Sequence, residues 1–298
     1  MEFMKLTNFC VVCFVMFLSG LSYTLITPIF PLEALAREVT VSQSGIVMGS
    51  AFVTSFFSIP WSSFLVSQFG VRIVFIFATF VAGFANTLFG FISYTENATL
   101  YFWVSLFLRM FCAVGESLVA STAFTFGSEQ FTKDRQGIAM SMVETSFGIG
   151  LVVGPSLGGL FHNYWGFSTP FWTLGVLTLV LAGFSASILK PSKLPPCKQT
   201  DRNRTKWTDV LYCPNMLLIV VVFLITGNSA GFYSASLEPY LAEKFDLTPG
   251  GVGLVLMGFS ITYTITNPIV GVLLDSGFAP LRIVLMGKCV LITNMSLV

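Results

Sequence analysis

One stretch decides how this chain folds: Met142-Val-Glu-Thr-Ser-Phe-Gly-Ile-Gly-Leu-Val-Val-Gly-Pro-Ser-Leu-Gly-Gly-Leu-Phe161. It is apolar enough to lie in lipid, yet it carries a carboxylate, a proline and five glycines. Gly150, Gly154 and Gly158 are four residues apart, so they share one face of a helix. Because glycine lets backbones approach closely, this face predicts tight packing against another helix inside a membrane.

Two further residues of the stretch are unusual for a membrane helix. Pro155 removes a backbone amide and bends a helix unless its neighbours compensate. Glu144 is a carboxylate, which is costly in lipid and usually faces a bundle interior or a wet cavity. The stretch therefore fits two interpretations equally well, a packed helix with one structural carboxylate or the gate helix of a transporter.

Composition places the whole chain in a membrane. Of the 298 residues 54% are hydrophobic and 10% are charged, whereas soluble domains have about 25% charged residues. The net charge of +1 gives no field that would attract nucleic acid. His162 is the single histidine, which excludes a zinc-protease motif, and the glycine runs lack the Lys-Ser/Thr of a phosphate loop. We expect no metal, no cofactor and no enzymatic activity.

Apolar runs predict an all-α polytopic protein. Six runs of bilayer-spanning length cover residues 6–30, 45–66, 72–94, 100–126, 137–162 and 169–189. We expect the first to end at Pro28 and Pro31. The chain then divides into a six-helix N-terminal bundle (1–190), a polar cytoplasmic linker (191–214) and a partial C-terminal bundle (215–298). This last part holds spans at 216–241 and 252–274 and the start of a ninth at 281.

Lysine and arginine placement predicts the orientation. With the N-terminus in the cytoplasm, eleven basic residues lie on the cytoplasmic side and two, Arg37 and Lys244, on the other. Asn97-Ala-Thr99 is then a glycosylation sequon on the non-cytoplasmic side, close to the membrane.

Besides Glu144, three ionisable residues within spans stand out. Arg109 and Glu116 are seven residues apart and share a helix face. Their rise of about 10.5 Å is long for direct pairing, but both can face one cavity. Arg109 could instead snorkel to a membrane surface. Glu238 precedes Pro239 and is a gate residue or an interfacial one.

These charges suggest a mechanism. A carboxylate removed from water holds a proton more readily, because burial disfavours its charged form. A cationic substrate would compete with the proton for the same carboxylate, which is antiport. Aromatic side chains such as Tyr23 could add cation–π contacts.

Several motifs resemble the major facilitator superfamily. The fifth span resembles its antiporter motif, through Gly150, Gly154, Pro155, Gly158 and Gly159. Arg109 with Gly115 is a loose version of its fourth-helix motif. Its cytoplasmic loop motif is similar at Gly70 and Arg72, with Ser67 where aspartate is expected, and again at Gly271, Asp275 and Arg282. The resemblance implies a complete six-helix half plus about two and a half helices of the second.

Closer similarity points to the vesicular polyamine branch of solute carrier family 18. It rests on residues 23–31, 143–161, 243–247 and 259–268. The resemblance implies a proton-coupled antiporter that loads organic cations, such as spermidine and spermine, into acidic secretory or synaptic-type vesicles. It implies Glu144 as proton or cation carrier and Glu238 as a second; Glu116 does not match the family cleanly.

Two alternatives remain open. A monoamine or multidrug antiporter belongs to the same class of protein. Since the chain stops inside the ninth span, a non-transporting partner of a full-length relative is the alternative from a different class.

Overall fold

The computed structural model describes residues 2–132, 135–189 and 249–279, together with 221, 244, 282–284 and 286–287. The chain divides into two compact units, one of residues 1–196 with 260–298 and one of residues 197–259. The linker at 191–214, the seventh span at 216–241 apart from residue 221, and Glu238 lie outside the described residues. The division of the chain at this linker stays a prediction.

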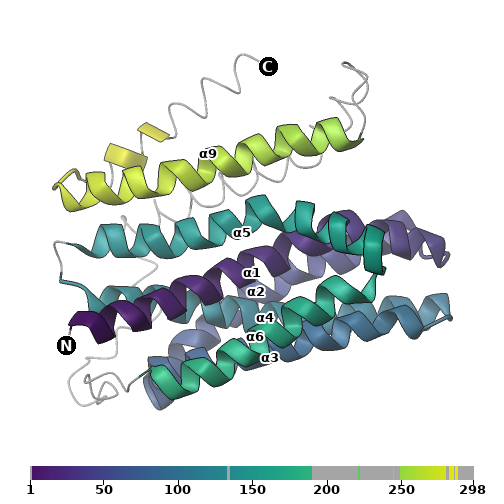
Figure 1. Ribbon diagram of the computed structural model, residues 1–298, viewed down its shortest axis with the longest axis horizontal. Helices are drawn as coiled ribbons and strands as arrows, with labels where there is room; N and C mark the ends of the chain where they lie inside the picture. Colours follow the sequence, from purple (N-terminus) through teal and green to yellow (C-terminus); the bar gives the residue numbers. More distant parts are fainter. Residues whose placement is uncertain are drawn as a thin grey trace. The chain divides into compact units, whose positions relative to one another are not determined.

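The elements of the described residues are all helical (Figure 1). They are α1 (Glu2–Ala36), α2 (Val41–Phe69), α3 (Val71–Phe89), the 3₁₀ turn η1 (Gly90–Tyr94), α4 (Ala98–Gln130), α5 (Gln136–Trp165), α6 (Ser168–Ile188) and α9 (Pro249–Asp275). Within the part of the chain that the structure describes, six helices, α1 to α6, are long and apolar enough to cross a membrane. The prediction of an all-α polytopic membrane protein is confirmed.

The first helix is longer than expected. We predicted that it ends at Pro28 and Pro31, and that prediction is wrong, because α1 continues to Ala36. Its last turn is held from outside by Arg37, which pairs with Glu33 at 2.9 Å and donates to the Ser93 carbonyl at 2.6 Å. Such outside partners stabilise a turn weakened by proline.

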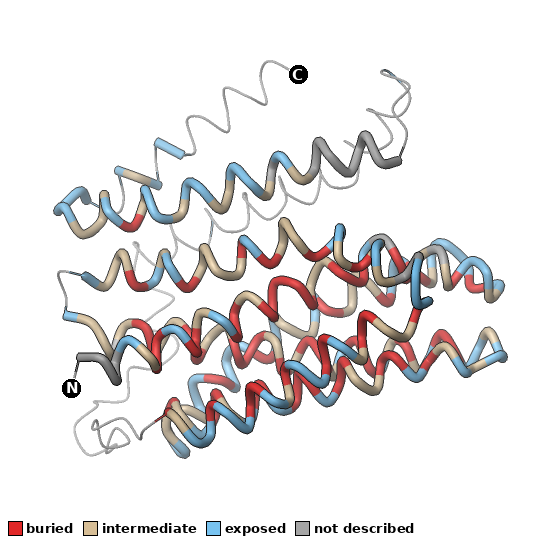
Figure 2. The backbone as a smooth tube through the Cα atoms, in the orientation of Figure 1, coloured by how far each residue is buried: buried red, intermediate tan, exposed pale blue. Residues whose placement is uncertain are grey.

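Packing distinguishes α1 from α2. In the most apolar 18-residue window of each helix, 67% of the residues of α1 are buried and only 17% of those of α2; Figure 2 marks buried residues in red along the tube. Helix α1 packs most extensively on α5, α3 packs on α4 and α6, and α2 packs on α4. The large side chains Phe52, Phe56 and Trp61 of α2 are exposed, as expected for a face covered by lipid.

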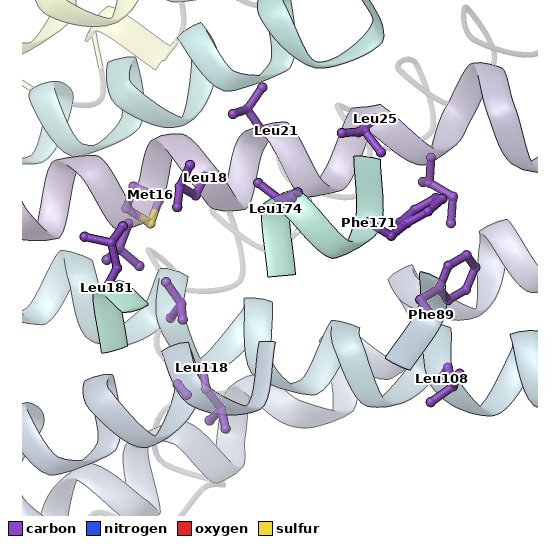
Figure 3. Packing of buried hydrophobic residues seen from close by; sticks show 14 of the residues in the cluster. Met16, Leu18, Leu21, Leu25, Phe89, Leu108, Leu118, Phe171, Leu174 and Leu181 are labelled. Carbon is purple, nitrogen blue, oxygen red and sulfur yellow. The ribbon is translucent and has the colours of Figure 1, made fainter. Parts of the chain in front are cut away.

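The hydrophobic core lies between the first six helices. Figure 3 shows part of it, with Met16 and Leu18 from α1, Leu118 from α4 and Leu174 and Leu181 from α6. This core fixes the helices that carry the polar residues described next.

Candidate functional site

A group of polar side chains joins α1, α3 and α4 inside this core. We call Ser22, Asn86, Cys112 and Glu116 the Glu116 cluster. The Ser22 hydroxyl donates to Oε1 of Glu116, and Asn86 Nδ2 donates to the Ser22 hydroxyl at 2.9 Å. The Cys112 thiol donates to the same carboxylate oxygen at 3.4 Å. Ser22, Asn86 and Cys112 are buried, so Glu116 is held inside the bundle by neutral donors.

Gly115 allows this cluster to form. A Cβ at this position would lie 2.6 Å from the Ala82 nitrogen and 2.9 Å from its Cα, which is closer than atoms pack. Glycine therefore lets α4 touch the backbone of α3. Asn86 lies one turn after Ala82 on the same face of α3, and its side chain donates to Ser22.

Arg109 lies in the interior of α4, 11 residues after Ala98 and 21 before Gln130. It is only 4% exposed, and its Nε is buried without a hydrogen-bond partner. The snorkelling interpretation is therefore wrong, because a guanidinium at a membrane surface would reach water. Within the described ranges Arg109 forms no ion pair, but both Arg109 and Glu116 interact electrostatically with Tyr23.

Tyr23 links this region to two more helices. Its ring contacts Phe52 of α2 edge-on, with 5.8 Å between ring centroids, and Phe147 of α5 at 6.2 Å. Of the predicted residues, the structure thus brings Tyr23, Arg109 and Glu116 together.

Glu144 has a different neighbour. Its carboxylate accepts a hydrogen bond from the Tyr263 hydroxyl of α9, and neither side chain belongs to the Glu116 cluster. The two predicted carboxylates therefore occupy separate surroundings, one inside the first six helices and one between α5 and α9.

The glycine row of α5 faces α1. A Cβ at Gly150 would lie 2.7 Å from the Leu21 nitrogen, and one at Gly158 would lie 2.8 Å from the Leu25 carbonyl oxygen. Both helix backbones therefore touch, as the four-residue spacing predicts. Gly159 is different, because a Cβ there would meet nothing within 4 Å. Pro155 is exposed, and α5 is continuous through it.

A second face of α5 packs on the described residues of α9. Both oxygens of Asp275 accept backbone hydrogen bonds at the start of α5, from Gly137 N at 2.7 Å and Ile138 N at 2.8 Å. A carboxylate at a helix N-terminus satisfies free amides and is favoured by the helix dipole. Gly271 lies against Ser141, with a position for Cβ only 2.8 Å from the Gly137 carbonyl oxygen.

The other loop-motif residues have local roles. Gly70 joins α2 to α3 with φ of 81°, a conformation that favours glycine. Arg72 donates to the Ala186 carbonyl at 2.7 Å, near the end of α6 where a cation is favoured. Arg282 is exposed.

Asn97 caps a helix. Its side-chain oxygen accepts hydrogen bonds from the amides of Thr99 at 2.9 Å and Leu100 at 3.2 Å, at the start of α4. The residue is exposed, so its glycosylation stays a prediction.

Sequence reasoning missed Ser22, Asn86 and Tyr263. Each lies beside other hydroxyl-bearing residues of its membrane-spanning segment, so nothing in the sequence singles it out until its neighbour is known. Arg37 was missed as a clamp, although Glu33 four residues earlier is the spacing of a helical ion pair.

Comparison with known proteins adds the family. The family model described as Major Facilitator Superfamily matches residues 12–237. The chain belongs to the major facilitator superfamily. Transport is therefore the activity of its family, and this member is a multi-pass membrane protein.

This superfamily member is similar to several curated proteins. It is 28% identical to MFS-type transporter SLC18B1 of Mus musculus over 256 residues, which cover 86% of this chain and 54% of that protein. The Homo sapiens protein of the same name is 27% identical over 265 residues, 89% of this chain and 56% of that protein. Synaptic vesicular amine transporter of Homo sapiens is 24% identical over 232 residues, 78% and 43% respectively. The chain spans about half the length of these relatives.

Proposed function

We propose that this protein is a proton-coupled antiporter that moves organic cations, polyamines in particular, into acidic vesicles. One observation carries the proposal: Glu116 and Glu144 lie within membrane-spanning helices and are held there by the neutral donors Ser22, Cys112 and Tyr263. Across the described ranges, neither carboxylate forms an ion pair. Each is free to exchange a proton for a cation.

The direction of exchange follows from the proton gradient. A carboxylate that faces the acidic compartment takes up a proton, and one that faces the neutral side releases it. A cationic amine presented from the neutral side then takes the place of the proton. No cofactor is needed, because the proton gradient supplies the free energy.

Two carboxylates with separate surroundings suit a substrate with several positive charges. This favours polyamines such as spermidine and spermine, in line with the resemblance to the polyamine branch of solute carrier family 18. The similarity to Synaptic vesicular amine transporter favours monoamines as the second candidate. In this proposal the N-terminus, Arg72 and Asp275 face the cytoplasm, where the positive-inside rule places the basic loops.

The test is uptake into liposomes with an acidic interior. Radiolabelled spermidine and radiolabelled serotonin are offered separately to the reconstituted protein, with and without a protonophore. We expect spermidine uptake that the protonophore abolishes. Strong serotonin uptake without spermidine uptake would rule out polyamines as the substrate and leave the antiporter proposal in its monoamine form. Uptake of either substrate at the same rate with and without the protonophore would contradict proton coupling.

A further inference from the structure

The described part of α9 follows α5 in a regular antiparallel register. Gly137 contacts Asp275, Ser141 contacts Gly271, and Gly148 contacts Thr264. Each step of four or seven residues along α5 is matched by an equal step backward along α9. These are the spacings of one helix face. We call this face the α5–α9 contact.

Glu144 is the ionisable member of this face in the middle of α5. It lies between Ser141 and Gly148, and the register places it opposite Pro268, the residue after Asn267. Its hydrogen-bond donor is Tyr263, one turn away from Asn267 on α9. Asn267 lies beside Tyr263, and its Nδ2 is buried without a partner. Among the described residues of α9, the polar groups nearest to Glu144 are thus the Tyr263 phenol and, beside it, the Asn267 amide, both neutral.

We propose that Tyr263 is a positioning residue. The strength of its hydrogen bond depends on whether Glu144 is protonated, and this bond sets how firmly α9 packs on α5 in the α5–α9 contact. A hydrogen bond to an ionised carboxylate is about twice as strong as one between neutral groups. While Glu144 is ionised, Tyr263 holds α9 against α5. When Glu144 takes a proton or a cation, this bond weakens and the contact loosens. The proposal rests on the proposed function, in which Glu144 exchanges these two ligands.

The other ionisable groups around α5 lie away from Glu144. Titratable and charged residues with described side chains on the helices that pack against α5 are Tyr263 and Asp275 on α9, Cys10, Cys13, Tyr23 and Glu33 on α1, and Tyr101, Arg109, Cys112 and Glu116 on α4. Described residues of α6 include none. Of these groups, Tyr263 contacts Glu144 directly. Arg109 and Glu116 lie near Tyr23, and Cys112 donates to Glu116. Glu33 and Tyr101 both contact Arg37, and Asp275 lies at the end of the contact.

The structure supplies its own reporter for the contact. The amides of Gly137 and Ile138 donate to Asp275, so they are protected from hydrogen exchange only while α9 is seated at the start of α5. We therefore measure exchange by mass spectrometry for peptides that cover residues 136–142, in the full chain reconstituted in lipid nanodiscs. Peptides of α3 and α6 serve as an internal reference for folding, and rates are corrected for intrinsic exchange.

We expect protection of these amides to fall about tenfold as the pH drops from about 8 to about 5, the size of effect of one hydrogen bond to a charged group. Tyr263→Phe, which removes only the hydroxyl, should give low protection at both pH values, and Glu144→Gln should do the same. Tyr164→Phe is the matched control on an exposed tyrosine and should behave like the unaltered chain.

Two results would overturn the proposal: protection that does not change with pH in the unaltered chain, or a pH dependence that survives in Tyr263→Phe. Spermidine uptake by the same samples separates this proposal from the transport proposal. A pH-dependent contact without uptake leaves the Tyr263 link standing and removes the antiporter function. Proton-driven uptake together with an α5–α9 contact that Tyr263→Phe does not change keeps the antiporter function and removes the Tyr263 link.

Discussion

The two carboxylates of this protein sit in contrasting surroundings. Glu116 lies among residues of the first four helices, bound by Ser22 and Cys112 in a packed interior. Glu144 is bound by one hydroxyl of α9, 119 residues further along the chain. Loss of the Glu116 hydrogen bonds disturbs the core between α1, α3 and α4. Loss of the Glu144 hydrogen bond weakens the contact between α5 and α9, which otherwise rests on small residues and on the Asp275 hydrogen bonds to the start of α5.

The contrast suggests a division of labour. In alternating-access carriers, one group of helices moves against another around a central site. A carboxylate buried within one group experiences little change, while a carboxylate at a contact between helices gains and loses its partner. We therefore expect replacement of Glu116 to lower stability as well as transport, and replacement of Glu144 to lower transport without lowering stability. The following predictions break or sharpen this comparison.

The largest effect is expected where α5 touches α1, because both surroundings depend on that contact. In Gly154→Leu the new side chain would meet Thr24 and the Leu21 carbonyl oxygen, which a Cβ already approaches to 3.2 Å. We expect a loss of about 3 kcal/mol or more of stability, measured as the yield of monodisperse protein in detergent. Gly159→Leu is the matched control in the same helix, because a Cβ there meets nothing within 4 Å. Equal yields for the two variants would show that the glycine row does not hold α1.

Glu144→Gln and Glu116→Gln test the division of labour directly. Glu144→Gln keeps the shape of the side chain and removes its titration, so we expect proton-driven uptake to be abolished while the protein stays folded. Glu116→Gln removes a negative charge near buried Arg109 and weakens hydrogen bonds to a charged acceptor, so we expect about 1–3 kcal/mol lower stability. Uptake and thermal unfolding are measured for both variants. Normal uptake by Glu144→Gln would exclude Glu144 as an essential carrier.

Much of the fold was predictable from the sequence. Long apolar runs form helices in lipid because every backbone amide must be satisfied within the segment, so the six spans and the glycine face of α5 follow from composition and spacing. The end of α1 did not follow, because the clamp on its last turn is formed by Arg37 with carbonyls 56 and 58 residues away.

The candidate site was predictable only in part. An acidic residue in an apolar run reveals itself, which is how Glu116 and Glu144 were found. Their partners Ser22 and Tyr263 could not be predicted, because a serine or tyrosine is common in a membrane helix and the pairing depends on which helices are neighbours. Gly159 shows the opposite error, since it belongs to the sequence motif but makes no close contact.

A smaller effect is expected at the end of the α5–α9 contact. Asp275→Asn keeps an oxygen for one amide of Gly137 or Ile138 but removes the charge and one acceptor. We expect this to cost about 1 kcal/mol, as for loss of a helix N-cap, and to raise hydrogen exchange at residues 137 and 138 at every pH. Exchange that rises throughout α5 would mean instead that Asp275 supports the whole helix.

The smallest effect is expected at Cys112, which separates hydrogen bonding from charge in the Glu116 cluster. Cys112→Ser keeps a donor four residues before Glu116, whereas Cys112→Val removes the donor from a buried site of similar volume. Since the thiol is a weak donor, we expect less than about 0.5 kcal/mol for serine and about 1 kcal/mol for valine, both measured by thermal unfolding. If valine were no worse than serine, Ser22 would be sufficient to hold Glu116. The hydrogen bonding of Glu116 would then come from Ser22 of α1 alone. In that case a movement of α1 relative to α4 would remove the hydrogen-bond partner of Glu116.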